Sequence, residues 1–269
     1  MPAVLGIDAA WTATQPSGVA LAVKDSTTWR LVAVAPSYRY FTALPQHVPV
    51  PPTRPSGSLP EVVPLLAAAS SLCARTVDLV AVDMPLARSP IVARRYCDNH
   101  VSRAYGSRKC GTYPPTASRP GALSDDLTRD FTRAGYPLLT TVIAPPGVIE
   151  VYPHPALVEL TGAAERVPYK VSKVSIYWPL VSPLEQRRRL YSKWKQIISF
   201  LECEISDVTA ALPQLELSTR GGKLKAHENM LDAIVCAWVG ICALEGRAIP
   251  YGDDDAAIWI PHPRVAPPG

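Results

Sequence analysis

The chain has 269 residues, of which 48% are hydrophobic, and its formal net charge is +4 at pH 7. This length and composition fit one large α/β domain with insertions, and the small positive charge permits a polyanionic partner without requiring one. The six cysteines form no CxxC pair, which argues against a structural zinc site or a disulfide framework. No basic leader or run of ~18 apolar residues is found, so we expect a cytoplasmic, soluble protein.

The N-terminal part of the sequence predicts three strands. Residues 3–11 form an apolar run that carries one carboxylate, Asp8, and this pattern is typical of a central strand. Residues 15–18 predict a turn, residues 19–23 a returning strand and residues 28–35 a third strand. We therefore expect an antiparallel three-stranded start.

The middle of the chain alternates between proline-rich and apolar segments. Residues 44–60 are expected to be a loop, and the apolar spacing in 61–75 predicts a helix. Residues 78–83 predict a second fully apolar strand, which ends in Asp83. The basic, irregular stretch 88–146 is interpreted as an insertion or cap over one edge of the sheet.

The C-terminal half of the chain predicts a third short apolar strand and three helices. The strand is expected at 147–153, and the helices at 155–160, 183–201 and 224–244. The second helix is amphipathic, whereas the body of the last is apolar nearly all round and should be buried. The proline-rich segment 250–269 is expected to lack regular structure.

Four acids occur where burial is expected. Asp8, Asp83 and Glu150 lie at or near the ends of predicted strands, and Asp232 lies inside the last helix, one turn after Glu228. Glu228 is a fifth candidate metal ligand. Buried carboxylates need cations, and oxygen-only ligands select Mg²⁺ or Mn²⁺. Two such ions ~4 Å apart would suit phosphodiester hydrolysis. Each acid alone could instead cap a turn or pair with an arginine, and Glu228 could complement the helix N-terminus.

Basic and aromatic residues supply candidate substrate contacts. They are Arg94, Arg95, Lys109, Tyr113 and Lys170. The first four lie in the insertion, where they could contact a nucleic-acid backbone and stack on bases. A solvated basic face explains them equally simply, and a surface lysine is the plain interpretation of Lys170.

Several stretches, taken in order, resemble a known family. They are residues 6–11 with 16–20, 81–86, 150–156, 168–170 and 232–238. They resemble the domain of unknown function 429 family, whose members are predicted to be ribonuclease H-like nucleases. The resemblance implies an α/β fold with a mixed sheet, three antiparallel first strands, helices on both faces and a metal-binding acid cluster.

The same resemblance assigns the site. It implies that Asp8 is the first-strand acid, that Asp83 and Glu150 come from later strands, and that Asp232 comes from the last helix. The implied activity is two-metal hydrolysis of DNA or RNA by a single domain over residues 1–269.

Two other functions fit parts of the sequence. An ATP-dependent phosphotransferase of the actin and sugar-kinase type also has an Asp on its first strand, but usually follows it with a glycine and hydroxyl turn for phosphate. Here Trp11 stands close behind Asp8, and no glycine-rich phosphate loop is evident. A non-catalytic nucleic-acid or protein-binding module is the third possibility, and metal binding distinguishes it from the nuclease.

Overall fold

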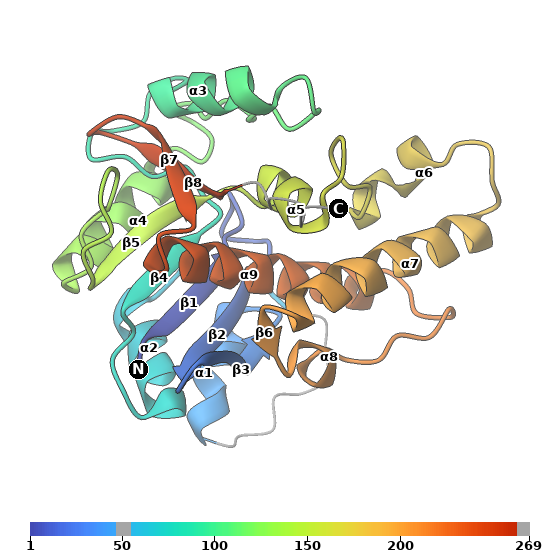
Figure 1. The fold of residues 1–269 in the computed structure, drawn as a ribbon, viewed down its shortest axis with the longest axis horizontal. Helices are drawn as coiled ribbons and strands as arrows, with labels where there is room; N and C mark the ends of the chain where they lie inside the picture. The colour runs from blue at the N-terminus through green and yellow to red at the C-terminus, as the bar shows by residue number, and fades with distance from the viewer. Residues whose placement is uncertain (47–54, 263–269) are drawn as a thin grey trace.

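The computed structural model describes residues 1–46 and 55–262. They form a mixed α/β fold around an eight-stranded sheet with the order β6-β3-β2-β1-β4-β5-β8-β7 (Figure 1). The strands are β1 (Ala3–Asp8), β2 (Gly18–Asp25), β3 (Thr28–Ala35), β4 (Leu79–Val82), β5 (Gly147–Val151), β6 (Ile205–Ser206), β7 (Ala248–Gly252) and β8 (Ala257–Pro261). The α-helices are α1 (Tyr38–Ala43), α2 (Val62–Cys73), α3 (Tyr96–Tyr105), α4 (Ala122–Arg133), α5 (Pro153–Thr161), α6 (Val174–Tyr177), α7 (Pro183–Glu202), α8 (Val208–Ala211) and α9 (Gly222–Leu244).

The sheet changes from antiparallel to parallel at β1. Strand β2 pairs antiparallel with both β1 and β3, consistent with the expected start of the chain. On its other side β1 pairs in parallel with β4, and β4 pairs in parallel with β5. Strand β8 continues the parallel order next to β5, and β7 closes the edge antiparallel to β8. The carboxyl ends of β1, β4 and β5 therefore meet at one edge of the sheet.

Helix α9 covers one face of the central strands, and α7 packs outside it (Figure 1). The close approach of α9 depends on glycine. A Cβ on Gly6 of β1 would lie 2.2 Å from the carbonyl oxygen of Ala233, and a Cβ on Gly18 of β2 would lie 2.0 Å from that of Asn229. Small residues at these contacts place the polar side chains of α9 directly over the ends of β1 and β2.

Helices α1, α2 and α4 cover the other face of the sheet. Their buried side chains, including Phe41, Leu65 and Phe131, share one apolar cluster with Leu5 and Ile7 of β1. Helix α3 instead packs against β7 and β8 at the far edge (Figure 1). Within the stretch expected to be an insertion, α3 thus covers a sheet edge, whereas α4 belongs to the main core.

The expectation of an irregular segment from residue 250 is wrong as far as residue 261, because β7 and β8 lie there. Pro250 is tolerated because β7 is an edge strand, where a missing backbone N–H need not break the ladder. The remaining tail, 263–269, and part of the expected proline-rich loop, 47–54, lie outside the described residues.

Helix α9 is one helix of the described chain whose length and composition would suffice to cross a membrane. In its most apolar window, however, 94% of the residues are buried inside the fold. Its apolar surface on all sides is explained by the sheet on one side and α7 and α5 on the others.

Candidate functional site

Asp8 and Asp83 lie side by side at the carboxyl ends of two neighbouring parallel strands. Ile7 is in register with Val82, and the backbone N–H of Asp83 donates to the carbonyl of Ile7 at 2.9 Å. Alternation along β1 directs Val4, Gly6 and then Asp8 toward α9. The same alternation along β4 brings Asp83 to that face. The local strand pattern therefore places two carboxylates next to each other.

Burial and mutual repulsion raise the pKa values of both carboxyl groups. Burial is the largest cause for Asp8, whose pKa rises to about 7; Asp232 raises it further, and Lys170 and Lys225 oppose the rise. Burial followed by the charge of Asp8 raises the pKa of Asp83 well above its usual value. Within residues 1–46 and 55–262, neither carboxylate accepts a hydrogen bond or forms an ion pair. This pair is therefore the part of the site that most needs a cation.

Asp232 and Glu228 lie above the same face, on α9, but both already have cationic partners. Asp232 accepts hydrogen bonds from the Tyr169 hydroxyl (2.6 Å) and from the ammonium group of Lys170. Glu228 is paired with Lys225, and it lies 3.8 Å from the ammonium of Lys170. Burial is the largest single cause and lowers the pKa of Lys170, but Asp232 and the other anionic neighbours together outweigh it, so the pKa is raised and this lysine stays charged.

Glu150 points to the opposite face of the sheet. It is in register with Val82, and Val80, Val82 and Val148 pack on the α2 side. Arg95 binds it with both terminal nitrogens, at 2.6 and 2.7 Å, and the backbone N–H of Leu86 donates to it at 2.7 Å. Sequence reasoning expected Glu150 to join the other acids. In the structure it is instead neutralised by its own arginine.

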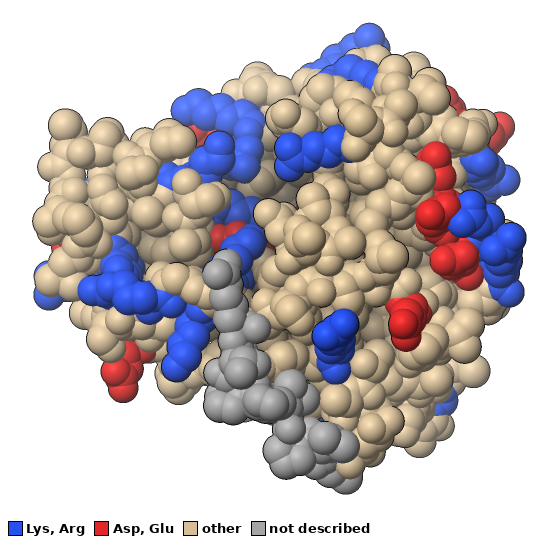
Figure 2. Space-filling model, turned by 180° about the vertical axis from the view of Figure 1, so that it is seen from behind, with Lys and Arg blue, Asp and Glu red and all other residues tan. Residues whose placement is uncertain are grey.

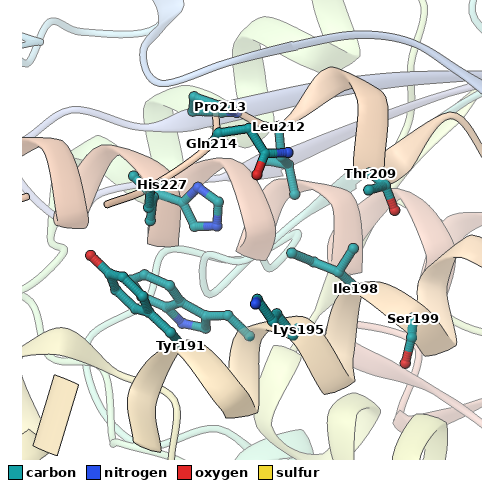
Figure 3. Close-up of a pocket in the computed structure, with 11 residues that line it drawn as sticks. Tyr191, Lys195, Ile198, Ser199, Thr209, Leu212, Pro213, Gln214 and His227 are labelled. Carbon is teal, nitrogen blue, oxygen red and sulfur yellow. The ribbon is translucent and has the colours of Figure 1, made fainter. Parts of the chain in front are cut away.

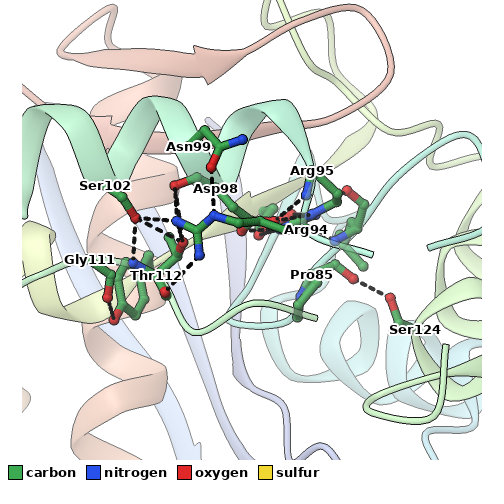
Figure 4. A network of polar contacts seen from close by, with 12 residues as sticks. Pro85, Arg94, Arg95, Asp98, Asn99, Ser102, Gly111, Thr112 and Ser124 are labelled. Atoms are coloured by element: carbon green, nitrogen blue, oxygen red, sulfur yellow. Dashed lines mark hydrogen bonds and ion pairs between the residues drawn. The ribbon is translucent and has the colours of Figure 1, made fainter. Parts of the chain in front are cut away.

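The residues expected to contact substrate have different roles. Arg95 holds Glu150 and also Asp98, so it is a structural partner rather than a free surface cation. Arg94 donates to Asn99 and Ser102 of α3, each at 2.6 Å, and to the Thr112 hydroxyl at 3.2 Å, so it joins α3 to the following loop (Figure 4). Lys109 pairs with an exposed glutamate at 2.6 Å.

Tyr113 is the aromatic member of the candidate contacts in the insertion, and it lies on the surface. It is 69% exposed and meets Trp11 edge to face, with ring centroids 6.1 Å apart. Both aromatic residues line a small cavity that also contains Asp83 and Glu150. Asp83 thus lies between the Asp8 group on one side and an aromatic surface on the other.

The structure adds site residues that the sequence reasoning missed. Asp8 lines a cavity of about 190 Å³ together with Gln15, Lys225 and Asn229. Asn229 is buried; its amide nitrogen donates to the carbonyl of Pro16, and its Oδ1 has no partner among the described residues. The sequence held a signal for these residues. Asn229 lies three residues before Asp232, and Lys225 lies four residues before Asn229, so all three share one face of the helix.

The five acids therefore form two groups. Within the part of the chain that the structure describes, Asp8 and Asp83 have no cationic partner, whereas Asp232, Glu228 and Glu150 are each paired with a lysine or an arginine. Among the described residues, no three His, Cys, Asp or Glu side chains are arranged as a preformed metal site. Asp8 and Asp83, with the unpartnered Asn229 oxygen nearby, have the donor chemistry that a hard divalent ion requires. Asp232, Glu228 and Glu150 would first have to leave lysine or arginine partners.

Fold and site together define a mixed α/β protein with buried carboxylates and lysines at the carboxyl edge of its sheet. The chain belongs to the family described as "Protein of unknown function (DUF429)", whose sequence profile matches residues 6–257. This confirms the family expected from the sequence. No curated protein and no solved structure matches the chain.

Proposed function

We propose that the protein is a divalent-metal-dependent nuclease with a ribonuclease H-like fold. Support for the fold comes from the three antiparallel strands, the two parallel strands that follow, and the acid-bearing last helix packed on them. The observation that carries the proposed chemistry is the Asp8–Asp83 pair. Two adjacent, half-buried carboxylates with raised pKa values are stabilised most simply by a shared cation.

Charge balance favours one divalent ion over the two expected from the sequence. The acids on the α9 side carry four negative charges and the lysines beside them carry two positive ones, which leaves a formal charge of −2. These groups are Asp8, Asp83, Glu228, Asp232, Lys170 and Lys225. One divalent ion neutralises this charge, whereas a second would leave an excess of positive charge unless a lysine moved away.

In this proposal each residue has a defined part. Asp8 and Asp83 would hold Mg²⁺ or Mn²⁺, which when bound supplies Lewis acidity toward a phosphate oxygen. Lys170 would hold the Asp232 carboxylate in place through their ion pair. Lys225 lines the Asp8 cavity and is half exposed, so an incoming phosphate would meet it while it is paired with Glu228.

The surface charge of the described residues offers separate basic groups for a nucleic-acid substrate and no continuous basic strip on the face that Figure 2 shows. Figure 2 shows the face opposite to that of Figure 1, where Lys and Arg form several separate groups rather than one continuous strip. One hollow there contains acidic atoms between basic ones. Exposed Tyr113 beside Trp11 adds a surface on which a base can stack. We propose DNA or RNA as the substrate, in the cytoplasm.

The test is a nuclease assay on single- and double-stranded DNA and RNA with Mg²⁺ or Mn²⁺. We expect cleavage that EDTA abolishes and that Asp8→Asn and Asp83→Asn both eliminate. Asp254→Asn, at an exposed position distant in sequence from the site, should retain activity. Metal-dependent cleavage that survives in Asp8→Asn would refute the assignment.

A non-catalytic binding module is the second candidate. It is favoured by the ion pairing of three of the five acids, which suits a structural role. In that case nucleic acid would bind without being cleaved, and neither Asp→Asn variant would alter binding.

A further inference from the structure

A separate cavity lies on the outer side of α9, and neither Asp8 nor Asp83 lines it. It has a volume of about 320 Å³ and opens between α7, the segment 209–215 and the start of α9 (Figure 3). This volume falls at the lower end of the range for small-molecule sites. It is thus large enough for a small ring compound.

The walls of this cavity are aromatic and aliphatic. Tyr191 and Trp194 of α7 stack with ring centroids 5.6 Å apart and an interplanar angle of 19°. Ile198 continues this wall, and Leu212 and Leu215 face it from the other side. Flat aromatic surfaces combined with aliphatic side chains favour a planar ring over a flexible chain.

Two polar groups in the cavity lack partners. His227 is only 4% exposed, its ring packs on Trp194 with centroids 4.8 Å apart, and its buried Nδ1 has no hydrogen-bond partner among the described residues. Burial lowers its pKa to about 4, so at neutral pH the ring offers one donor and one acceptor. Exposed Lys195 likewise has no carboxylate or hydrogen-bond partner in the described chain. Figure 3 shows both side chains directed toward the same space.

We propose that this cavity binds a small planar aromatic anion. The ring would pack on the wall containing Tyr191, its anionic group would pair with Lys195, and a polar ring atom would hydrogen-bond to His227. A buried imidazole without a partner is unfavourable in the folded chain, and such a ligand satisfies it. The site shares no side chain with the proposed metal pair, so it is independent of the proposed nuclease function.

The test is isothermal titration calorimetry of the full chain with three probes. Indole-3-carboxylate has both a flat ring and a charge, indole-3-carboxamide lacks the charge, and cyclohexanecarboxylate lacks the flat ring. We expect saturable one-to-one binding of the first and at least ~fivefold weaker binding of the other two. Equal affinities, or no saturable binding of indole-3-carboxylate below about 5 mM, would overturn the proposal.

Variants locate the binding site. Lys195→Met, on the exposed face of α7, should fold normally and reduce the affinity for indole-3-carboxylate to that for the carboxamide. Lys223→Met, an exposed lysine outside the cavity lining, serves as the matched control and should bind like the wild type. His227→Phe should weaken binding of both indoles, with thermal unfolding confirming that the variant is folded. If Lys195→Met binds like the wild type, the probe occupies another place and this assignment is wrong.

Discussion

Asp8→Asn should stabilise the protein in metal-free buffer above neutral pH. The pKa of Asp8 rises from 3.8 to about 7 on folding, and a pKa unit corresponds to about 1.36 kcal/mol. The ionised Asp8 therefore costs up to about 4 kcal/mol of folding free energy, which the neutral amide avoids. We expect a gain of about 2–4 kcal/mol, since local relaxation reduces the full value.

The pH dependence follows from the raised pKa. Below 3.8, Asp8 is protonated in both the folded and unfolded chains and imposes no penalty. As the pH rises toward about 7, the unfolded chain releases this proton first, so stability is lost progressively and the loss levels off above that pH. The advantage of Asp8→Asn should therefore grow across this interval.

The assay is urea denaturation in EDTA at several pH values, followed by circular dichroism. Asp254→Asn provides the matched control and should show no such trend. Saturating Mg²⁺ should narrow the difference, because a bound cation stabilises only the ionised pair. If Asp8→Asn unfolds more easily than the wild type in EDTA at pH 8, Asp8 is a structural residue and the reasoning fails.

Three further substitutions test contacts in and around the site, and Lys109→Met serves as a comparison for one of them. Arg95→Met leaves Glu150 buried without its partner and should destabilise by about 3–5 kcal/mol at pH 8, but less at pH 5, in denaturant titrations. Lys170→Met should cost a similar amount, whereas breaking the exposed pair with Lys109→Met should cost under about 1 kcal/mol; equal losses would contradict the buried role of Lys170. Gly6→Ala places a Cβ 2.2 Å from the carbonyl oxygen of Ala233, so it should lower the free energy of unfolding by about 2 kcal/mol or more and lower the melting temperature. An unchanged melting curve would show that α9 can shift.

The regular elements of the core were predictable from the sequence. Apolar runs bounded by turn residues located β1, β3 and β5, and the apolar spacing of α2 and α9 located those helices. Local periodicity was sufficient there because each element buries a continuous surface. In contrast, β7 and β8 were missed because their prolines suggested a loop, and only the sheet shows that β7 is an edge strand.

The partition of the acids was not predictable from the sequence. Whether Glu150 faces Asp83 or the opposite side depends on the register between β4 and β5, and a shift of one residue reverses it. Its partner Arg95 lies 55 residues away in sequence, and no local pattern joins them. The pairing of Lys170 with Asp232 is equally long-range, at 62 residues.

We propose above that Asp8 and Asp83 together bind one divalent ion. The most direct measurement is a Mn²⁺ titration of the full chain, with free Mn²⁺ quantified by electron paramagnetic resonance. We expect saturation at one ion per chain for the wild type and for Asp254→Asn, and loss of this site in Asp8→Asn. Saturation at two ions, or binding that Asp8→Asn leaves intact, would contradict it.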